Sequence, residues 1–78
     1  MSLEKLKKAF AISLEMEMNT ITDDLTYNSI AQWDSVAHMI LVAEIEQTFD
    51  ILIETDDVLD MSTFAKARDI VVKYGVIL

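Results

Sequence analysis

The sequence contains no cysteine and no proline, and it has a single glycine and a single histidine. Without cysteine the chain can form no disulfide framework, no thiolate metal site and no cysteine nucleophile. One histidine is too few for a histidine-based metal site or a proton relay. With helix-breaking residues so scarce and 53% of the residues hydrophobic, the composition favours helices.

Long apolar runs are missing as well. The longest, Met39 to Ala43, is far shorter than the roughly 20 residues of a membrane-spanning helix. The chain carries a charge already at Glu4 and lacks the apolar segment of a signal peptide. We therefore expect a soluble, cytoplasmic protein.

Basic residues are absent from the middle of the chain. The net charge is −8, and between Ala9 and Ala65 there are twelve acidic residues but no lysine or arginine. Nucleic acid is a poor partner for such a chain, because phosphate binding requires positive charge. A protein with a basic docking surface is a better one.

The length of 78 residues allows one small domain, which we place at residues 1–78. We predict an all-α fold, a small four-helix bundle with a long first loop and a short third helix. The first helix is expected from about Leu3 to Met16, after Ser2 as N-cap.

The loop that follows, residues 17–33, is rich in turn-forming side chains, yet apolar residues are spaced through it. A loop of this length is more often attached to a core than disordered. The expected attachment points are Ile21, Leu25, Ile30 and Trp33.

Three further helices are expected at Asp34 or Ser35 to Phe49, at Thr55 to Asp60, and at Ser62 or Thr63 to Tyr74. Asp34 and Thr55 are the expected N-caps. Gly75 is the expected C-terminal stop of the last helix.

Three short segments of this layout form a pattern: Trp33-Asp34-Ser35-Val36, then Phe49-Asp50-Ile51-Leu52-Ile53, then Thr55-Asp56-Asp57. The pattern resembles the acyl carrier protein family. In that family an Asp-Ser-Leu motif opens the second helix, a Phe-Asp-Ile-x-Ile segment ends it, and a short acidic helix follows. The resemblance covers almost the whole chain.

The resemblance implies a free-standing acyl carrier protein that is not itself an enzyme. It would hold an acyl group as a thioester on a 4′-phosphopantetheine arm attached to Ser35. A separate phosphopantetheinyl transferase would move this arm from coenzyme A in a reaction that uses Mg²⁺. Asp34 would position the start of the helix and present a carboxylate to the transferase. Without the resemblance, both residues would be interpreted as a helix cap.

The outer face of the predicted second helix is unusually apolar for an exposed surface. In the family this helix is the recognition surface for partner enzymes, such as those that load and transfer the acyl group. We therefore predict a partner surface made of Val36, Ile40, Ala43, Glu44, Glu46 and Gln47 on a monomeric protein.

This surface departs from the family's common pattern, because Val36 replaces Leu, Ile40 stands where Glu is frequent, and Ala43 where Met is frequent. These differences argue against service to the general enzymes of fatty acid biosynthesis. The segment Trp-Asp-Ser-Val-Ala-His-Met more closely resembles that of specialised carriers in secondary-metabolite or surface-polysaccharide pathways.

The same residues are compatible with other functions. An aminoacyl or peptidyl carrier has nearly the same motif, and an unmodified acidic helical interaction module would use Ser35 only as a cap. An EF-hand is excluded, because the acidic residues of the third helix lack its spacing and central glycine.

A hydrolase built on Asp34, Ser35 and His38 is disfavoured, because Asp34 cannot readily sit behind His38 to orient it. His38 instead falls on the inward side of the second helix, with Val42, Ile45 and Phe49. We expect it to pack against the long loop and to form a hydrogen bond with the backbone.

Overall fold

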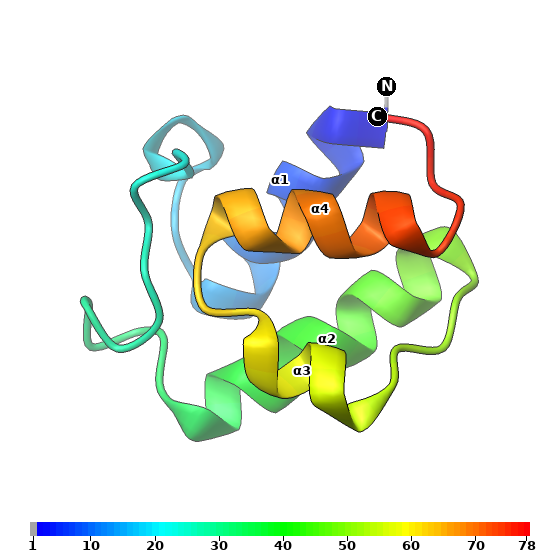
Figure 1. The fold of residues 1–78 in the computed structure, drawn as a ribbon. Helices are drawn as coiled ribbons and strands as arrows, with labels where there is room; N and C mark the ends of the chain where they lie inside the picture. Colours follow the sequence, from blue (N-terminus) through cyan, green and yellow to red (C-terminus); the bar gives the residue numbers. More distant parts are fainter. Residues whose placement is uncertain (1) are drawn as a thin grey trace.

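The computed structural model describes residues 2–78. Within this range the fold is all-α, as predicted, with no β-strand beyond an isolated bridge between Thr26 and Thr63. The four α-helices are joined by loops, the first of which contains a short 3₁₀ helix (Figure 1). In chain order the elements are α1 (Ser2–Leu14), η1 (Met18–Thr20), α2 (Ser35–Phe49), α3 (Thr55–Asp60) and α4 (Phe64–Lys73).

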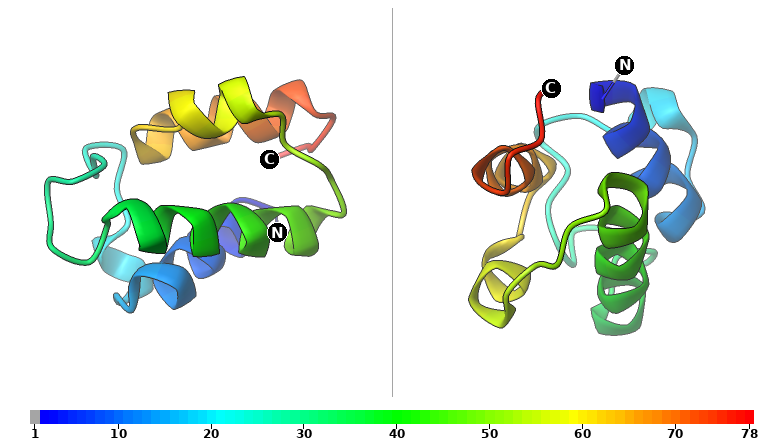
Figure 2. Two further views of the ribbon diagram at one scale, coloured as in Figure 1. Left: turned by 90° about the horizontal axis from the view of Figure 1, so that it is seen from below. Right: turned by 90° about the vertical axis from the view of Figure 1, so that its right-hand side faces the viewer.

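The helices form two layers around a shared core. The helices α1 and α2 lie on one side of the molecule, and α3 and α4 lie on the other (Figures 1 and 2). Phe10 links the layers, because its ring packs edge-on against the rings of Phe64 and Trp33. The ring centroids are 4.9 Å apart for Phe10 and Phe64 and 5.5 Å apart for Phe10 and Trp33. The largest fully buried side chains are Trp33, Phe10, Phe64, Leu6, Leu14, Ile21, Leu41, Ile45, Met61 and Val71.

Side-chain caps begin two of the helices. Asp34 accepts a hydrogen bond from the amide of Ala37 and caps α2, and Thr63 accepts one from the amide of Lys66 and caps α4. The prediction of Thr55 as a cap was wrong, because Thr55 is already helical and Glu54, at the cap position of α3, makes no side-chain bond.

The ends of α1 also differ from the prediction. Ser2, expected as the cap, is the first residue of the helix, and α1 stops at Leu14 rather than at Met16. The stop has a local cause. Glu15 takes up a left-handed conformation with φ of 55°, and the amide of Met16 turns back to the carbonyl of Ala11 at 2.9 Å. Such a motif satisfies carbonyl groups that the helix end leaves unpaired.

The same ending occurs twice more. Asp50 after α2 and Gly75 after α4 have positive φ angles, and the next residue in each case bonds back to the final turn of the helix. Gly75 is therefore the predicted stop of the last helix. Asp50 has the same backbone conformation without being a glycine.

The segment between α1 and α2 is attached to the core, as predicted. Ile21, Leu25 and Trp33 are buried in it, and Ile30 packs against their cluster. Two backbone bonds add to these contacts: the amide of Tyr27 donates to the carbonyl of Ser62, and the amide of Phe64 donates to that of Leu25. The segment is thus held along the start of α4.

None of the helices in residues 2–78 is both long and apolar enough to cross a membrane.

Candidate functional site

Ser35 is the first residue of α2, and its side chain is exposed. The helix begins here because Asp34 has an extended backbone and its Oδ1 lies 2.8 Å from the amide nitrogen of Ala37. The carboxylate of Asp34 therefore satisfies one of the amides that a helix start leaves unpaired. This leaves the hydroxyl of Ser35 without a structural task in the cap.

Directly behind this helix start, Trp33 and His38 form a partly buried hydrogen bond. The indole nitrogen of Trp33 donates to Nδ1 of His38 at 3.0 Å, and the two rings are stacked with their centroids 6.0 Å apart. The other ring nitrogen of His38, Nε2, lies 2.8 Å from the carbonyl oxygen of Val58 in α3. His38 thus joins the long loop, α2 and α3.

The sequence predicted that His38 packs against the long loop with a backbone hydrogen bond, and that it is not the base of a hydrolase triad. The ring contacts Tyr27 and Trp33 of the long loop, as expected, but its backbone partner belongs to α3. Both ring nitrogens are engaged, so neither is directed at Ser35 as the general base of a triad would be.

A cavity of about 280 Å³ opens beside Ser35. It lies where the start of α2 meets the end of α3 and the long loop, and its wall is mostly apolar. The residues that line it are Tyr27, Ser35, His38, Met39, Val58, Leu59, Met61 and Ser62.

Most of these lining residues were not identified from the sequence. Met39 was outside the predicted partner surface, although it is 60% exposed one turn beyond Ser35. Leu59 is 77% exposed within the acidic helix α3. An apolar residue in a short acidic helix is the one sequence signal that points to this part of the wall. The rest come together only through packing.

The predicted partner surface lies along the outer side of α2. Val36, Ile40, Ala43 and Gln47 are exposed there, while Glu44 is half-buried. The carboxylate of Glu46 has a structural partner, since its Oε2 accepts a hydrogen bond from the amide of Ile53 at 2.8 Å. Glu46 therefore also anchors the loop between α2 and α3.

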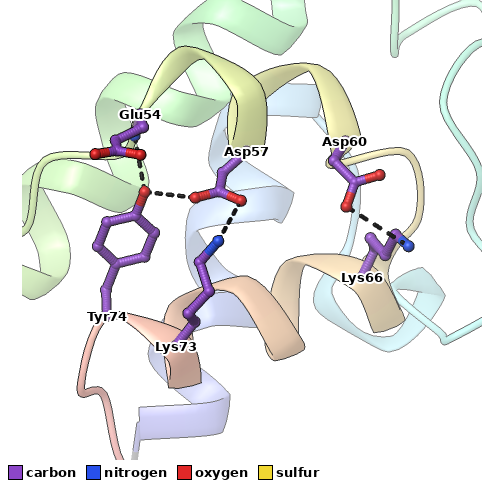
Figure 3. Close-up of polar contacts among 6 residues, drawn as sticks. All are labelled: Glu54, Asp57, Asp60, Lys66, Lys73 and Tyr74. Atoms are coloured by element: carbon purple, nitrogen blue, oxygen red, sulfur yellow. Dashed lines mark hydrogen bonds and ion pairs between the residues drawn. The ribbon is translucent and has the colours of Figure 1, made fainter.

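A second polar cluster ties α3 to α4 (Figure 3). Asp57 is buried, and its two oxygens accept bonds from Lys73 Nζ and from the hydroxyl of Tyr74, each at 2.6 Å. The hydroxyl of Tyr74 in turn accepts a bond from the amide of Glu54 at 2.9 Å. Every polar group at the centre of this cluster is therefore paired.

These contacts shift three pKa values. The hydrogen bond from Lys73, followed by that from Tyr74, lowers the pKa of Asp57 below 3.8. The bond to Asp57 raises the pKa of Lys73 above 10.5 and that of Tyr74 above 10.0. These shifts arise from hydrogen bonds that link α3 to the end of α4, and none of the three residues lines the cavity beside Ser35.

In the described part of the chain, no group of three or more histidine or acidic side chains is placed to hold a metal ion. Comparisons with protein-family models, with curated proteins and with solved structures found no match to this chain.

Proposed function

We propose that this chain is an acyl carrier protein that holds an acyl group as a thioester on a 4′-phosphopantetheine arm at Ser35. One observation carries the proposal beyond the sequence motif. The hydroxyl of Ser35 is exposed, is not needed for the helix cap, and borders an apolar cavity. An attached arm therefore has an open point of attachment and an apolar surface beside it.

The surroundings of Ser35 suit the chemistry of the arm. The phosphodiester would sit at the start of α2, where unpaired amides and the helix dipole favour a negative group. Asp34 would hold that helix start in place and present its carboxylate to the transferase. The arm supplies a thiol for the acyl thioester, and the protein supplies a tether that raises the local concentration of the acyl group at each partner enzyme.

The remaining parts of the proposal follow from the same resemblance. We interpret the two layers of helices as a small four-helix bundle. The exposed apolar side of α2 and the net charge of −8 suit partner enzymes with basic docking surfaces. We place the protein in the cytoplasm, in a specialised biosynthetic pathway.

The experiment is intact-mass measurement after incubation with coenzyme A and a broad-specificity phosphopantetheinyl transferase. We expect a gain of one arm in the wild type and none in Ser35→Ala. Ser62→Ala is the matched control, because Ser62 is also exposed and lines the same cavity. A gain that persists in Ser35→Ala, or its absence from the wild type, would contradict the proposal. Acyl and aminoacyl donors offered to the modified protein then distinguish the two kinds of carrier.

A further inference from the structure

His38 is one of the residues that line the cavity beside Ser35. The imidazole forms part of its wall, and behind the imidazole lies Trp33, which is completely buried. The bond between His38 Nε2 and the carbonyl oxygen of Val58 crosses from α2 to α3 at this point. An apolar chain entering from Ser35 therefore meets a hydrogen-bonded ring before it reaches Trp33.

His38 cannot turn aside freely. Rotation of its ring would break the bond with Val58 and also the bond from Trp33, whose indole nitrogen has no other partner within the described residues. A buried donor without an acceptor is unfavourable. The ring is thus held in place from both sides.

We infer that His38 is a specificity-determining residue that limits how long an apolar group can be held beside Ser35. The biological meaning of this inference rests on the proposed carrier function. An apolar cavity of about 150 Å³ accommodates benzene, so the 280 Å³ present here accommodates a group of roughly ten carbons. The favoured cargo is a short or medium aliphatic acyl group, and a longer chain stays partly in solvent.

The test attaches alkyl chains directly at position 35. The sequence has no cysteine, so Ser35→Cys supplies a single thiol. Alkyl methanethiosulfonates with four, eight and twelve carbons convert it to mixed disulfides, and the melting temperature of each product is measured. This series requires neither coenzyme A nor a transferase.

Two further substitutions in the Ser35→Cys background separate the bonds of His38. The side-chain amide of His38→Gln reaches the position of Nε2 and can donate to Val58. The side-chain oxygen of His38→Asn reaches the position of Nδ1 and can accept from Trp33, but it leaves the Val58 carbonyl without its partner. Val36→Ala, on the same helix but outside the cavity, is the control.

We expect the melting temperature to rise by about 5 °C or more from four to eight carbons, because more apolar surface is buried. From eight to twelve carbons, the melting temperature should change by less than about 2 °C in the Ser35→Cys parent and in the His38→Gln and Val36→Ala variants. Only in the His38→Asn variant should it rise again.

A melting temperature that continues to rise to twelve carbons in the Ser35→Cys parent would overturn the inference. Identical melting temperatures of His38→Gln and His38→Asn across the series would also overturn it, and so would melting temperatures that do not depend on chain length. Failure of the transferase to modify Ser35 contradicts the carrier function alone. The alkyl series measures the limit set by His38 in either case.

Discussion

The indole nitrogen of Trp33 donates to Nδ1 of His38 across 3.0 Å, and this bond determines the orientation of the imidazole. An indole nitrogen can only donate, so Nδ1 must accept, and the proton of the neutral ring is on Nε2. Nε2 then donates to the carbonyl of Val58. A contact between residues five positions apart thereby supports a hydrogen bond between α2 and α3.

Removal of this imidazole should destabilise the fold. We expect His38→Ala to lose about 1–3 kcal/mol of unfolding free energy, because the buried N–H of Trp33 is left unpaired. His38→Asn should lose less, since it retains an acceptor for Trp33. Urea unfolding followed by tryptophan fluorescence measures both. Equal losses in the two variants would show that the acceptor for Trp33 is not the important part of His38.

Ser35 and Asp34 should differ sharply in their contribution to stability. Ser35→Ala is expected to change the unfolding free energy by no more than about 0.5 kcal/mol, because the side chain is exposed. Asp34→Ala removes the acceptor of the Ala37 amide and should cost about 0.5–2 kcal/mol. Urea titrations of the two variants provide the comparison. A larger loss in Ser35→Ala would mean that its hydroxyl supports the fold.

Ile40 and Leu41 are neighbours on α2 with opposite environments. Ile40 is 53% exposed, as predicted for the partner surface, and Leu41 is completely buried. Leu41→Ala should cost about 2–5 kcal/mol. Ile40→Glu should leave the melting temperature nearly unchanged and should weaken binding to a partner enzyme. Loss of the folded state in Ile40→Glu, seen by circular dichroism, would place Ile40 in the core.

The cluster of Asp57, Lys73 and Tyr74 predicts a loss of stability at both ends of the pH scale. The pKa of Asp57 is lowered, so its contribution is present above pH 3.8 and is lost as the pH falls through the lower value in the folded state. The raised pKa values of Lys73 and Tyr74 give contributions that are present below pH 10.0 and are lost as the pH rises through the folded values.

Thermal melts measured from acidic to alkaline pH test whether stability is lost at both ends of the pH scale. Asp57→Asn should melt at a lower temperature near pH 7, and its stability should depend less on pH at both ends, because the carboxylate that joins the cluster is gone. Lys66→Met is the control, since Lys66 pairs with Asp60 at 3.6 Å on the exposed surface. If Asp57→Asn and the wild type had parallel pH profiles, the cluster would not be the source.

Moderate salt should stabilise the fold. Three bases of α4 pair with acidic residues, yet the net charge remains −8, so repulsion among the other carboxylates persists. About 0.1 M KCl shortens the Debye length to about 10 Å and should raise the melting temperature. Mg²⁺ at matched ionic strength should raise it further, because it binds carboxylate oxygens. An unchanged or lower melting temperature in both additions would show that the pairs formed by α4 already balance the surface.

Much of the helical layout follows from local features of the sequence. Asp34 and Thr63 are cap residues whose side chains bond to the amide three positions later, and Gly75 supplies a left-handed residue, so these ends were predictable. The end of α1 was not. Glu15 and Asp50 adopt the same left-handed conformation without the glycine that normally indicates it.

What the tertiary structure alone decided lies between the elements. The spacing of apolar residues identified Ile21, Leu25 and Trp33 as attachment points of the loop, and the Asp34 cap placed Ser35 at an exposed helix start. Both features could be predicted because they depend on residues a few positions apart. The bond from His38 to Val58 spans twenty positions, and the partners of Asp57 are sixteen and seventeen positions away. Such partners depend on how α3 packs against α2 and α4, and no local pattern encodes that distance. The cavity beside Ser35 is set by the same packing, since its walls come from three separate segments.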